Sequence, residues 1–283
     1  MGSFDLFSGR QILVATKHGK EQVIAPLLSE ALGLTCVVTD LLDTDLLGTF
    51  AGEVERSKSP LDTARQKCHM AMDITSTDLA IASEGSFGPH PNFPFIPAHE
   101  EILVLIDKIN AWEFVVKRLE TKTNYSQILL QSYDELEGFL AKALFPSHAF
   151  IIKKSSADTT DCVKGVHDEK TLRETIQFFM QCFGQCSLET DMRAMHNPTR
   201  MAVIHDLTKE LIQQIQTACP TCQAPGFRIS DIERGLPCAL CGQPTRSVKF
   251  EIYACHCCQF SEHRAPSHGL KMEDPMYCDF CNP

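Results

Sequence analysis

The chain alternates short apolar runs with longer stretches in which apolar residues recur every three or four positions. Runs at residues 12–16, 36–39 and 79–83 have the length and the β-rich composition of buried strands. Helical spacing is present at residues 21–32 and again from residue 60 onward. One stripe of the second helix carries Leu61, Ala64, Cys68, Ala71 and Met72. Strands that alternate with helices in this way predict an α/β domain.

The same alternation continues to about residue 216. We predict further strands at residues 102–106, 113–116, 149–152 and 187–190, and helices at residues 132–144, from Asp168 and from Pro198. Two helix starts carry capping arrangements, because Ser59 stands three residues before Asp62, and Ser132 stands three residues before Glu135. These elements complete a front domain over residues 1–216.

The apolar run at residues 79–83 ends in a single carboxylate, Glu84, which two glycines and two prolines soon follow. We expect Glu84 at the carboxyl end of this strand, with the chain turning sharply at Gly85 and Gly88. Ligands of open α/β sheets bind at that edge, where the loops diverge and leave a crevice. The alternative is an ordinary junction between a strand and a loop.

The composition, with 43% hydrophobic and 22% charged residues over 283 positions, is that of a soluble globular protein. No apolar run approaches the roughly 18 residues that span a bilayer, and the first residues lack a basic segment followed by an apolar core. We therefore expect a cytoplasmic protein without a membrane partner. The net charge is −10 and no region has a basic excess, so nucleic acid is not the expected partner.

Cysteine is concentrated at the C-terminal end, where nine of the 14 cysteines lie in the last 65 residues. Eight of them form four Cys-x-x-Cys pairs: Cys219 and Cys222, Cys238 and Cys241, Cys255 and Cys258, and Cys278 and Cys281. In a cytosolic chain this spacing indicates metal binding and not disulfides. We predict a zinc-binding domain over residues 217–283, with two structural zinc ions in closed four-cysteine sites.

The sequence leaves open which cysteine pairs share an ion. Sequential pairing would give two stacked ribbons, and interleaved pairing would give a cross-brace. Cys257 is the odd thiol, although it could replace Cys258 as a ligand. Three histidines are further substitutes: His256, His263 and His268.

Charged side chains fall in predicted loops and helix starts around one sheet edge. They are Lys17, Lys20, Glu53, Asp62, Lys67 and Glu84. Carboxylates at such an edge can hold magnesium, and lysines beside a glycine-containing turn can neutralise phosphate oxygens. Ordinary roles are the alternative: Lys67 as a solvated helix residue, Asp62 as a capping acid, and His18 and His90 as local hydrogen-bonding groups.

Five segments in a fixed order resemble the inosine/xanthosine triphosphate pyrophosphatase superfamily, which includes the bacterial non-canonical purine NTPases. The segments are ATKHGKE, AGEVER, SPLDTARQKC, LAIASEGSFG and VLID. The chain is most similar to an uncharacterised bacterial family that joins such a domain to a C-terminal zinc region. The resemblance covers residues 10–118 specifically and residues 119–205 loosely. It implies a mixed-sheet, pyrophosphatase-like α/β fold.

Carried over by position, the resemblance implies roles for individual side chains. Lys20 and Lys67 would contact the phosphates, and Glu53 would be a metal ligand. Glu84 would serve metal binding or water activation. The arginine near the base would be Arg193, with Arg200 as the other candidate.

The first turn departs from the family pattern of Thr or Ser, x, Asn, x, x, Lys. His18 replaces the asparagine, and the lysine comes one residue early. We still expect Thr16, Lys17 and His18, together with Ser86, to bind substrate. The pair of acids that follows the family's central strand is reduced to Glu84.

The function that follows is a magnesium-dependent hydrolase that converts a non-canonical nucleoside triphosphate to the monophosphate and pyrophosphate. The expected partner is a nucleotide substrate, and a homodimer is compatible with the sequence. The alternative is an inactive nucleotide sensor that uses its zinc domain to bind a protein or RNA. A third hypothesis gives the activity to the zinc region alone, with the front domain as a scaffold.

Overall fold

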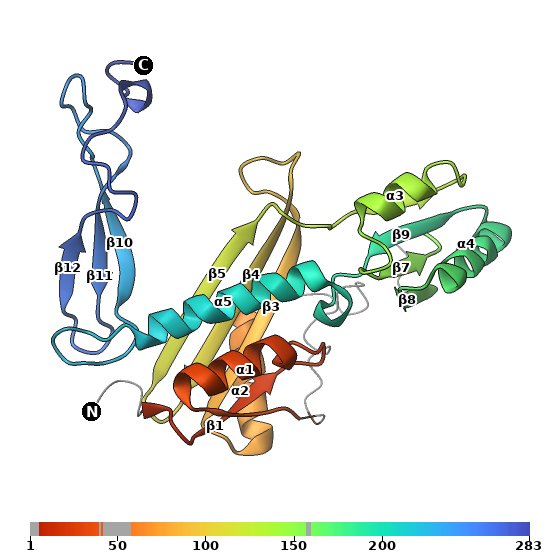
Figure 1. Cartoon of the computed structure of the whole chain (residues 1–283), viewed down its shortest axis with the longest axis horizontal. Coiled ribbons are helices and arrows are strands. Elements are labelled where there is room, and N and C mark those ends of the chain that lie inside the picture. The colour runs from red at the N-terminus through yellow and green to blue at the C-terminus, as the bar shows by residue number, and fades with distance from the viewer. Residues whose placement is uncertain (1–5, 40, 42–57, 157–159) are drawn as a thin grey trace. The chain divides into compact units, whose positions relative to one another are not determined.

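The computed structural model describes residues 6–39, 41, 58–156 and 160–283 (Figure 1). It is a mixed α/β structure with three separate sheets. The predicted metal ligand Glu53 lies outside the described residues. None of the described helices combines the length and the apolar character that a membrane crossing requires.

The described chain divides into two compact units, Phe7–Leu211 and Ile212–Pro283, the second of which also includes Leu6. The first unit contains a five-stranded sheet in the order β2-β1-β3-β4-β5, in which β2, β1 and β3 are parallel and β3, β4 and β5 are antiparallel. Its strands are β1 (Gln11–Ala15), β2 (Thr35–Val37), β3 (Leu79–Pro89), β4 (Pro97–Asp107) and β5 (Trp112–Glu120).

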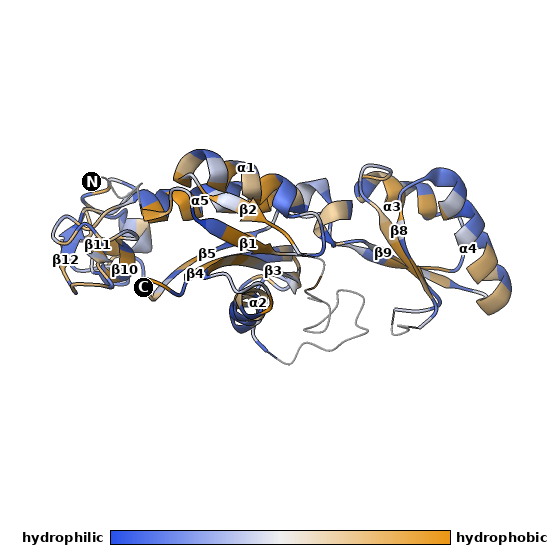
Figure 2. Ribbon diagram, turned by 90° about the horizontal axis from the view of Figure 1, so that it is seen from below, coloured by the Kyte–Doolittle hydropathy of each residue, from blue (hydrophilic) through white to orange (hydrophobic). Residues whose placement is uncertain are grey.

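Helices cover both faces of this sheet. Figure 2 shows α1 (Glu21–Leu32) and α5 (Pro198–Gln216) on one face and α2 (Pro60–Thr75) on the other. The predicted start of α2 is confirmed, since the Ser59 hydroxyl accepts a hydrogen bond from the Asp62 backbone N–H. The predicted stripe of α2 packs on the sheet, with Ala64, Cys68, Ala71 and Met72 buried and Leu61 partly buried.

The connections make a topological switch point at the carboxyl end of β1. From β1 the chain runs through α1 to its neighbour β2, whereas its other neighbour β3 is entered from α2 on the opposite face. The chain therefore leaves β1 on one face of the sheet and enters β3 from the other, and α/β sheets bind ligands at such a switch point.

The prediction that Glu84 ends its strand is wrong. Strand β3 continues to Pro89 and pairs with β4 along its full length, so that Gly85 and Gly88 lie within the strand and not in a turn. A long antiparallel partner outweighs the local preference of glycine and proline for turns. Strand β1, however, last pairs with β3 at Ala15 opposite Ala82. Glu84 therefore lies just beyond the end of β1, on the edge that β1 leaves uncovered.

The rest of the first unit is a four-stranded antiparallel sheet in the order β6-β9-β7-β8. Its elements are β6 (Gln127–Leu130), α3 (Leu136–Lys142), β7 (Phe150–Lys153), β8 (Cys162–Val166), α4 (Glu169–Phe183) and β9 (Cys186–Thr190). The helices bury a second apolar core against it. The Asp168 cap of α4 is confirmed, but Ser132 does not cap α3, which begins after Glu135.

The second unit is built on a small antiparallel sheet of β10 (Arg228–Arg234), β11 (Val248–Ala254) and β12 (Ser261–Arg264). Its apolar core is slight: Cys219, Phe227 and Cys255 are buried, and Tyr253 and Phe260 pack around them. A core of this size contributes too little to hold such a unit together by itself.

Candidate functional site

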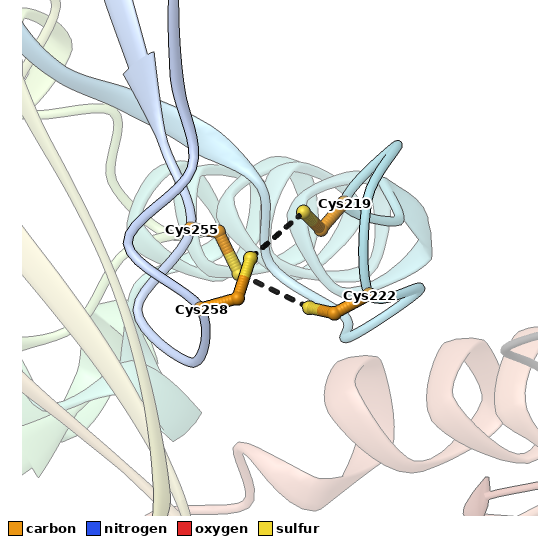
Figure 3. Close-up of side chains that lie close together, drawn as sticks. All are labelled: Cys219, Cys222, Cys255 and Cys258. Atoms are coloured by element: carbon orange, nitrogen blue, oxygen red, sulfur yellow. Dashed lines mark hydrogen bonds between the residues drawn. The ribbon is translucent and has the colours of Figure 1, made fainter.

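Eight cysteine sulfur atoms of the second unit gather into two groups of four. Figure 3 shows the first group, in which Cys219, Cys222, Cys255 and Cys258 direct their sulfurs at one point. The second group consists of Cys238, Cys241, Cys278 and Cys281. Within each group all four sulfurs lie within 4.8 Å of one another, and none forms a disulfide.

The pairing is interleaved, which decides between the two alternatives that the spacing allows. Strands β10 and β11 form an antiparallel hairpin in which Arg228 faces Ala254. The cysteine pair before β10 is therefore brought beside the pair that follows β11. The pair between these strands lies at the other end of the sheet, where Cys238 bridges to Glu273 shortly before the last pair.

Each cysteine pair forms the same tight turn. In all four turns a backbone N–H donates to the carbonyl of the first cysteine at 2.9–3.1 Å; the pairs are Gln223 and Cys219, Gly242 and Cys238, Gln259 and Cys255, and Asn282 and Cys278. In three turns another N–H donates to the first cysteine's sulfur at 3.4 Å. This arrangement aims two sulfurs at one ion and stabilises thiolate charge.

The sulfur separations fit zinc. Four thiolates about 2.3 Å from a tetrahedral zinc ion lie about 3.8 Å from one another. The measured separations are 3.7 Å for Cys219 and Cys258, and 3.5 Å for Cys222 and Cys255. In the second group the corresponding distances are 3.9 and 3.7 Å. Both groups could hold zinc in closed sites, and Cys257 belongs to neither group.

In the first unit, side chains from both faces of the sheet meet at β3. Lys20, the residue just before α1, donates through Nζ to the Ser83 hydroxyl at 2.8 Å and to the Ser83 carbonyl at 3.0 Å. Lys67, from α2 on the other face, forms an ion pair with Glu84. All four side chains are buried. The alternative prediction, that Lys67 is a solvated helix residue, is wrong, because its side chain is buried.

Burial and neighbouring cations shift the pKa values of two side chains in this cluster. Burial lowers the pKa of Lys20 to about 7, and the Arg200 guanidinium adds to this effect, against the carboxylates of Glu101 and Glu84. Burial likewise lowers the pKa of His18 to about 3, with Lys20 and Arg200 contributing. His18 is therefore neutral near pH 7 and cannot act as a cation there.

The other predicted binding residues lie on the turn after β1 and on β3. Thr16 is buried at the end of β1, and its hydroxyl accepts a hydrogen bond from the His18 backbone N–H at 3.1 Å. Lys17 is exposed on the same turn. Ser86 lies two residues beyond Glu84, so it shares the same face of β3.

The two candidate arginines differ in environment. Arg193 is partly exposed, and buried Asp191 holds its Nε and Nη2 atoms at 3.0 and 2.6 Å. Arg200 is fully buried and donates to both carboxylate oxygens of Glu101. Arg193 is therefore the candidate that substrate could reach.

Sequence reasoning missed His99 and Glu101. Both lie on β4, and Glu101 binds Arg200. Arg200 and a hydrogen bond from His99 outweigh the opposing effect of burial and lower the pKa of Glu101, which is therefore ionised. Two consecutive glutamates directly before the apolar run at residues 102–106 were the available signal. The partner of Glu101 lies 99 residues away, so these two glutamates alone could not predict the ion pair.

Comparison with protein families gives one finding that bears on identity. A family model described as "Domain of unknown function (DUF6671)" matches residues 67–283, which is more than half of the chain. The chain belongs to the DUF6671 family. A comparison with curated proteins finds no match.

The DUF6671 match covers both cysteine groups and begins at Lys67, so it also includes Glu84. It excludes β1, the turn that follows it and Lys20. The family description assigns no activity. The resemblance to the pyrophosphatase superfamily accordingly stays a prediction, which rests on the sequence segments that carry it.

Proposed function

We propose that the Phe7–Leu211 unit is a magnesium-dependent nucleoside triphosphate pyrophosphohydrolase, acting on non-canonical or modified nucleotides. The observation that carries the proposal is that Lys20 binds Ser83 on one face of β3 and Lys67 pairs with the adjacent Glu84 on the other, beside the switch point of the sheet. Buried lysines are expensive unless an anion offsets their charge. Glu84 already offsets the charge of Lys67, and a chain of phosphates would supply the anion for Lys20.

The turn between β1 and α1 would receive the phosphates. It ends at the N-terminus of α1, where backbone N–H groups and the helix dipole favour negative charge. Lys20 makes its hydrogen bonds to the neutral oxygens of Ser83. Its ammonium charge would therefore be balanced by substrate, and Lys17 on the same turn would add a second positive charge.

The donor set of this unit fits magnesium in one specific way. Among the described residues, groups of three or more metal-binding side chains occur only as the two cysteine clusters. Magnesium, however, is commonly held by one or two carboxylates together with substrate phosphates and water. Glu84 would supply a carboxylate ligand, and the ion would polarise the phosphoanhydride and lower the pKa of bound water.

The chain's own residues would then act on the substrate as follows. Water attacks the α-phosphorus, the bond to the oxygen that bridges to the β-phosphorus breaks, and pyrophosphate leaves. Lys20 and Lys67 would neutralise the negative charge that develops on the leaving group. Lys67 also holds the Glu84 carboxylate in place through their ion pair.

Pyrophosphate release tests this proposal. The full chain, incubated with magnesium and a panel of ITP, XTP and the common NTPs, is expected to release pyrophosphate from at least one of them. Lys20→Ala and Glu84→Gln are each expected to lower kcat/KM by about 100-fold or more. Lys170→Ala and Glu174→Gln change exposed charges on α4 and serve as matched controls.

No turnover by the wild-type chain, or equal turnover by the Lys20 and Glu84 variants, would overturn the enzyme proposal. Tight binding without hydrolysis in calorimetry would favour the nucleotide sensor instead. Hydrolysis that disappears when residues 217–283 are deleted would favour the zinc region as the active part. A homodimer and a cytoplasmic location stay predictions.

Nucleotide affinity is expected to depend on pH through Lys20. Because the pKa of Lys20 is about 7 in the free protein, the ammonium form that attracts phosphate is lost as the pH rises above that value. The Kd of a non-hydrolysable ITP analogue should rise by up to about tenfold per pH unit between pH 7 and 9. Lys20→Arg keeps its charge over this range, so the Kd of this variant should stay nearly constant. If the Kd of the variant rose with pH in parallel with that of the wild-type chain, the assignment to Lys20 would be contradicted.

A further inference from the structure

Arg200 makes contacts that an arginine with only a packing role does not need. Its side chain is 1% exposed, and its Nε and Nη2 atoms donate to the two oxygens of Glu101 at 2.9 and 3.0 Å. Its Nη1 atom donates to the backbone carbonyl of Met192 at 2.7 Å. One guanidinium thus ties strand β4 to the segment between β9 and α5.

Glu101 is held from a second side. The Nε2 atom of His99 lies 2.7 Å from Oε2 of Glu101, and the His99 ring stacks on Phe87 at 4.4 Å. The Arg200 guanidinium lies over the same Phe87 ring. His99, Glu101 and Arg200 are all buried, and we refer to them as the buried network.

Strand β3 leaves room for this network at Gly85, which pairs with Glu101. A Cβ atom at Gly85 would lie 2.5 Å from Oε2 of Glu101 and 2.6 Å from Nη2 of Arg200. At separations under 3.0 Å something must shift, so any larger residue at Gly85 would displace the Glu101 carboxylate or the Arg200 guanidinium. The same strand has open space around the corresponding position of Gly88.

The segment at residues 191–197 is fixed from both ends. Asn197 donates to Asn124 at 2.9 Å and accepts from the Arg200 backbone N–H at 2.9 Å, and Met192 is held by Arg200. Between these anchors the segment carries Arg193 and the short helix Ala194–His196. It packs close to the turn before α1. A Cβ atom added at Gly19 of that turn would lie 3.6 Å from Cβ of Met195.

We propose that the buried network is a positioning device, which holds the 191–197 segment against the β1–α1 turn so that Arg193 contacts the anionic substrate opposite Lys20. This inference rests on the proposed function. Arg193 and Lys20 both lower the pKa of His18, so both cations lie near the β1–α1 turn. An apolar core could stabilise the sheet equally well, because a buried ion pair seldom adds net stability. The network instead fixes an orientation, because the bidentate hydrogen bonds between Arg200 and Glu101 form in only one geometry.

Gly85→Ala tests the proposal, with Gly88→Ala as the matched control on the same strand. Two measurements on the full chain separate its parts. Hydrogen exchange reports whether residues 191–197 and the turn at 17–20 loosen. Calorimetry with magnesium and the α,β-methylene analogue of ITP reports the Kd. Gly85→Ala is expected to speed exchange in both segments and to raise the Kd at least tenfold, whereas Gly88→Ala should change neither.

A purely structural role would lower the melting temperature of Gly85→Ala and leave the Kd of the folded fraction unchanged, which would overturn the proposal. So would unchanged exchange at residues 191–197. If Gly85→Ala does not fold, His99→Gln keeps a donor for Glu101 but loses the stack on Phe87, and the same two changes are expected in smaller size. If the wild-type chain binds no analogue, the proposed function fails, while the exchange data still decide whether the network positions the segment.

Discussion

Removal of zinc from the full chain is expected to unfold residues 212–283 and to leave residues 7–211 folded. Binding of a structural zinc ion contributes about 10–16 kcal/mol at neutral pH, and in small units that energy is folding energy. The apolar core here is limited to a few residues around Cys219 and Cys255. The two ions are therefore expected to provide most of the stability of this unit.

Metal analysis and hydrogen exchange check this prediction. The purified chain should carry two zinc ions, and a strong chelator should abolish protection in β10, β11 and β12. Cys255→Ser should lower the zinc content to about one and open the adjacent end of the sheet. Cys257→Ser, two residues along, changes a thiol outside both groups and should keep both ions. Full protection in metal-free protein would contradict the prediction.

Arg200→Leu is expected to lower the free energy of unfolding of the first unit by about 3–5 kcal/mol. The substitution leaves the ionised carboxylate of Glu101 buried without its guanidinium partner, and it also removes the donor to the Met192 carbonyl. The chain's single tryptophan, Trp112, packs against Phe7 and Phe114, so its fluorescence reports on this unit during urea unfolding.

Two comparisons make the measurement specific. Arg173→Leu removes an exposed arginine that pairs with Glu137 and Glu169, and should cost about 1 kcal/mol or less. The double variant Arg200→Leu with Glu101→Leu should regain much of the loss, because neither charge of this pair is left buried without its partner. A loss for Arg200→Leu as small as that for Arg173→Leu would contradict the prediction.

The sign of the pH dependence follows from the pKa of Glu101. Because this pKa is lower in the folded chain than its ordinary value, the wild-type pair stabilises the fold above pH 4.5, and the contribution is lost as the pH falls further. The double variant should lack this acid-dependent part.

Features that depend on neighbouring residues could be predicted from the sequence. The Cys-x-x-Cys pairs are of this kind, because each turn places two sulfurs side by side whatever surrounds it. The start of α2 is another, since Ser59 and Asp62 lie within one helical turn. The apolar stripe of α2 likewise identified the face that packs on the sheet.

Features that depend on distant partners could not be predicted. Strand β3 is twice as long as the apolar run suggests, because β4 supplies a partner for its polar half. The interleaving of the cysteine pairs follows from the β10–β11 hairpin and not from any spacing. Strands β6 and β8 were not predicted, and they form the two edges of the second sheet, where β9 and β7 supply their partners.

The candidate site was predicted only in part, because some of its residues depend on distant partners. Lys20, Lys67 and Glu84 belong to separate short segments, and their order along the chain allowed them to be grouped. The structure brings these three to opposite faces of one strand. Arg200 and Glu101, by contrast, offered no spacing that links them.

A crystal structure of the full chain with magnesium and the α,β-methylene analogue of ITP tests the central claim most directly. The account predicts the triphosphate between the β1–α1 turn and β3, with phosphate oxygens bound by Lys20 and Lys67 and the metal ion bound by Glu84. An analogue bound elsewhere on the molecule, or an empty β1–α1 turn at saturating concentration, would contradict it.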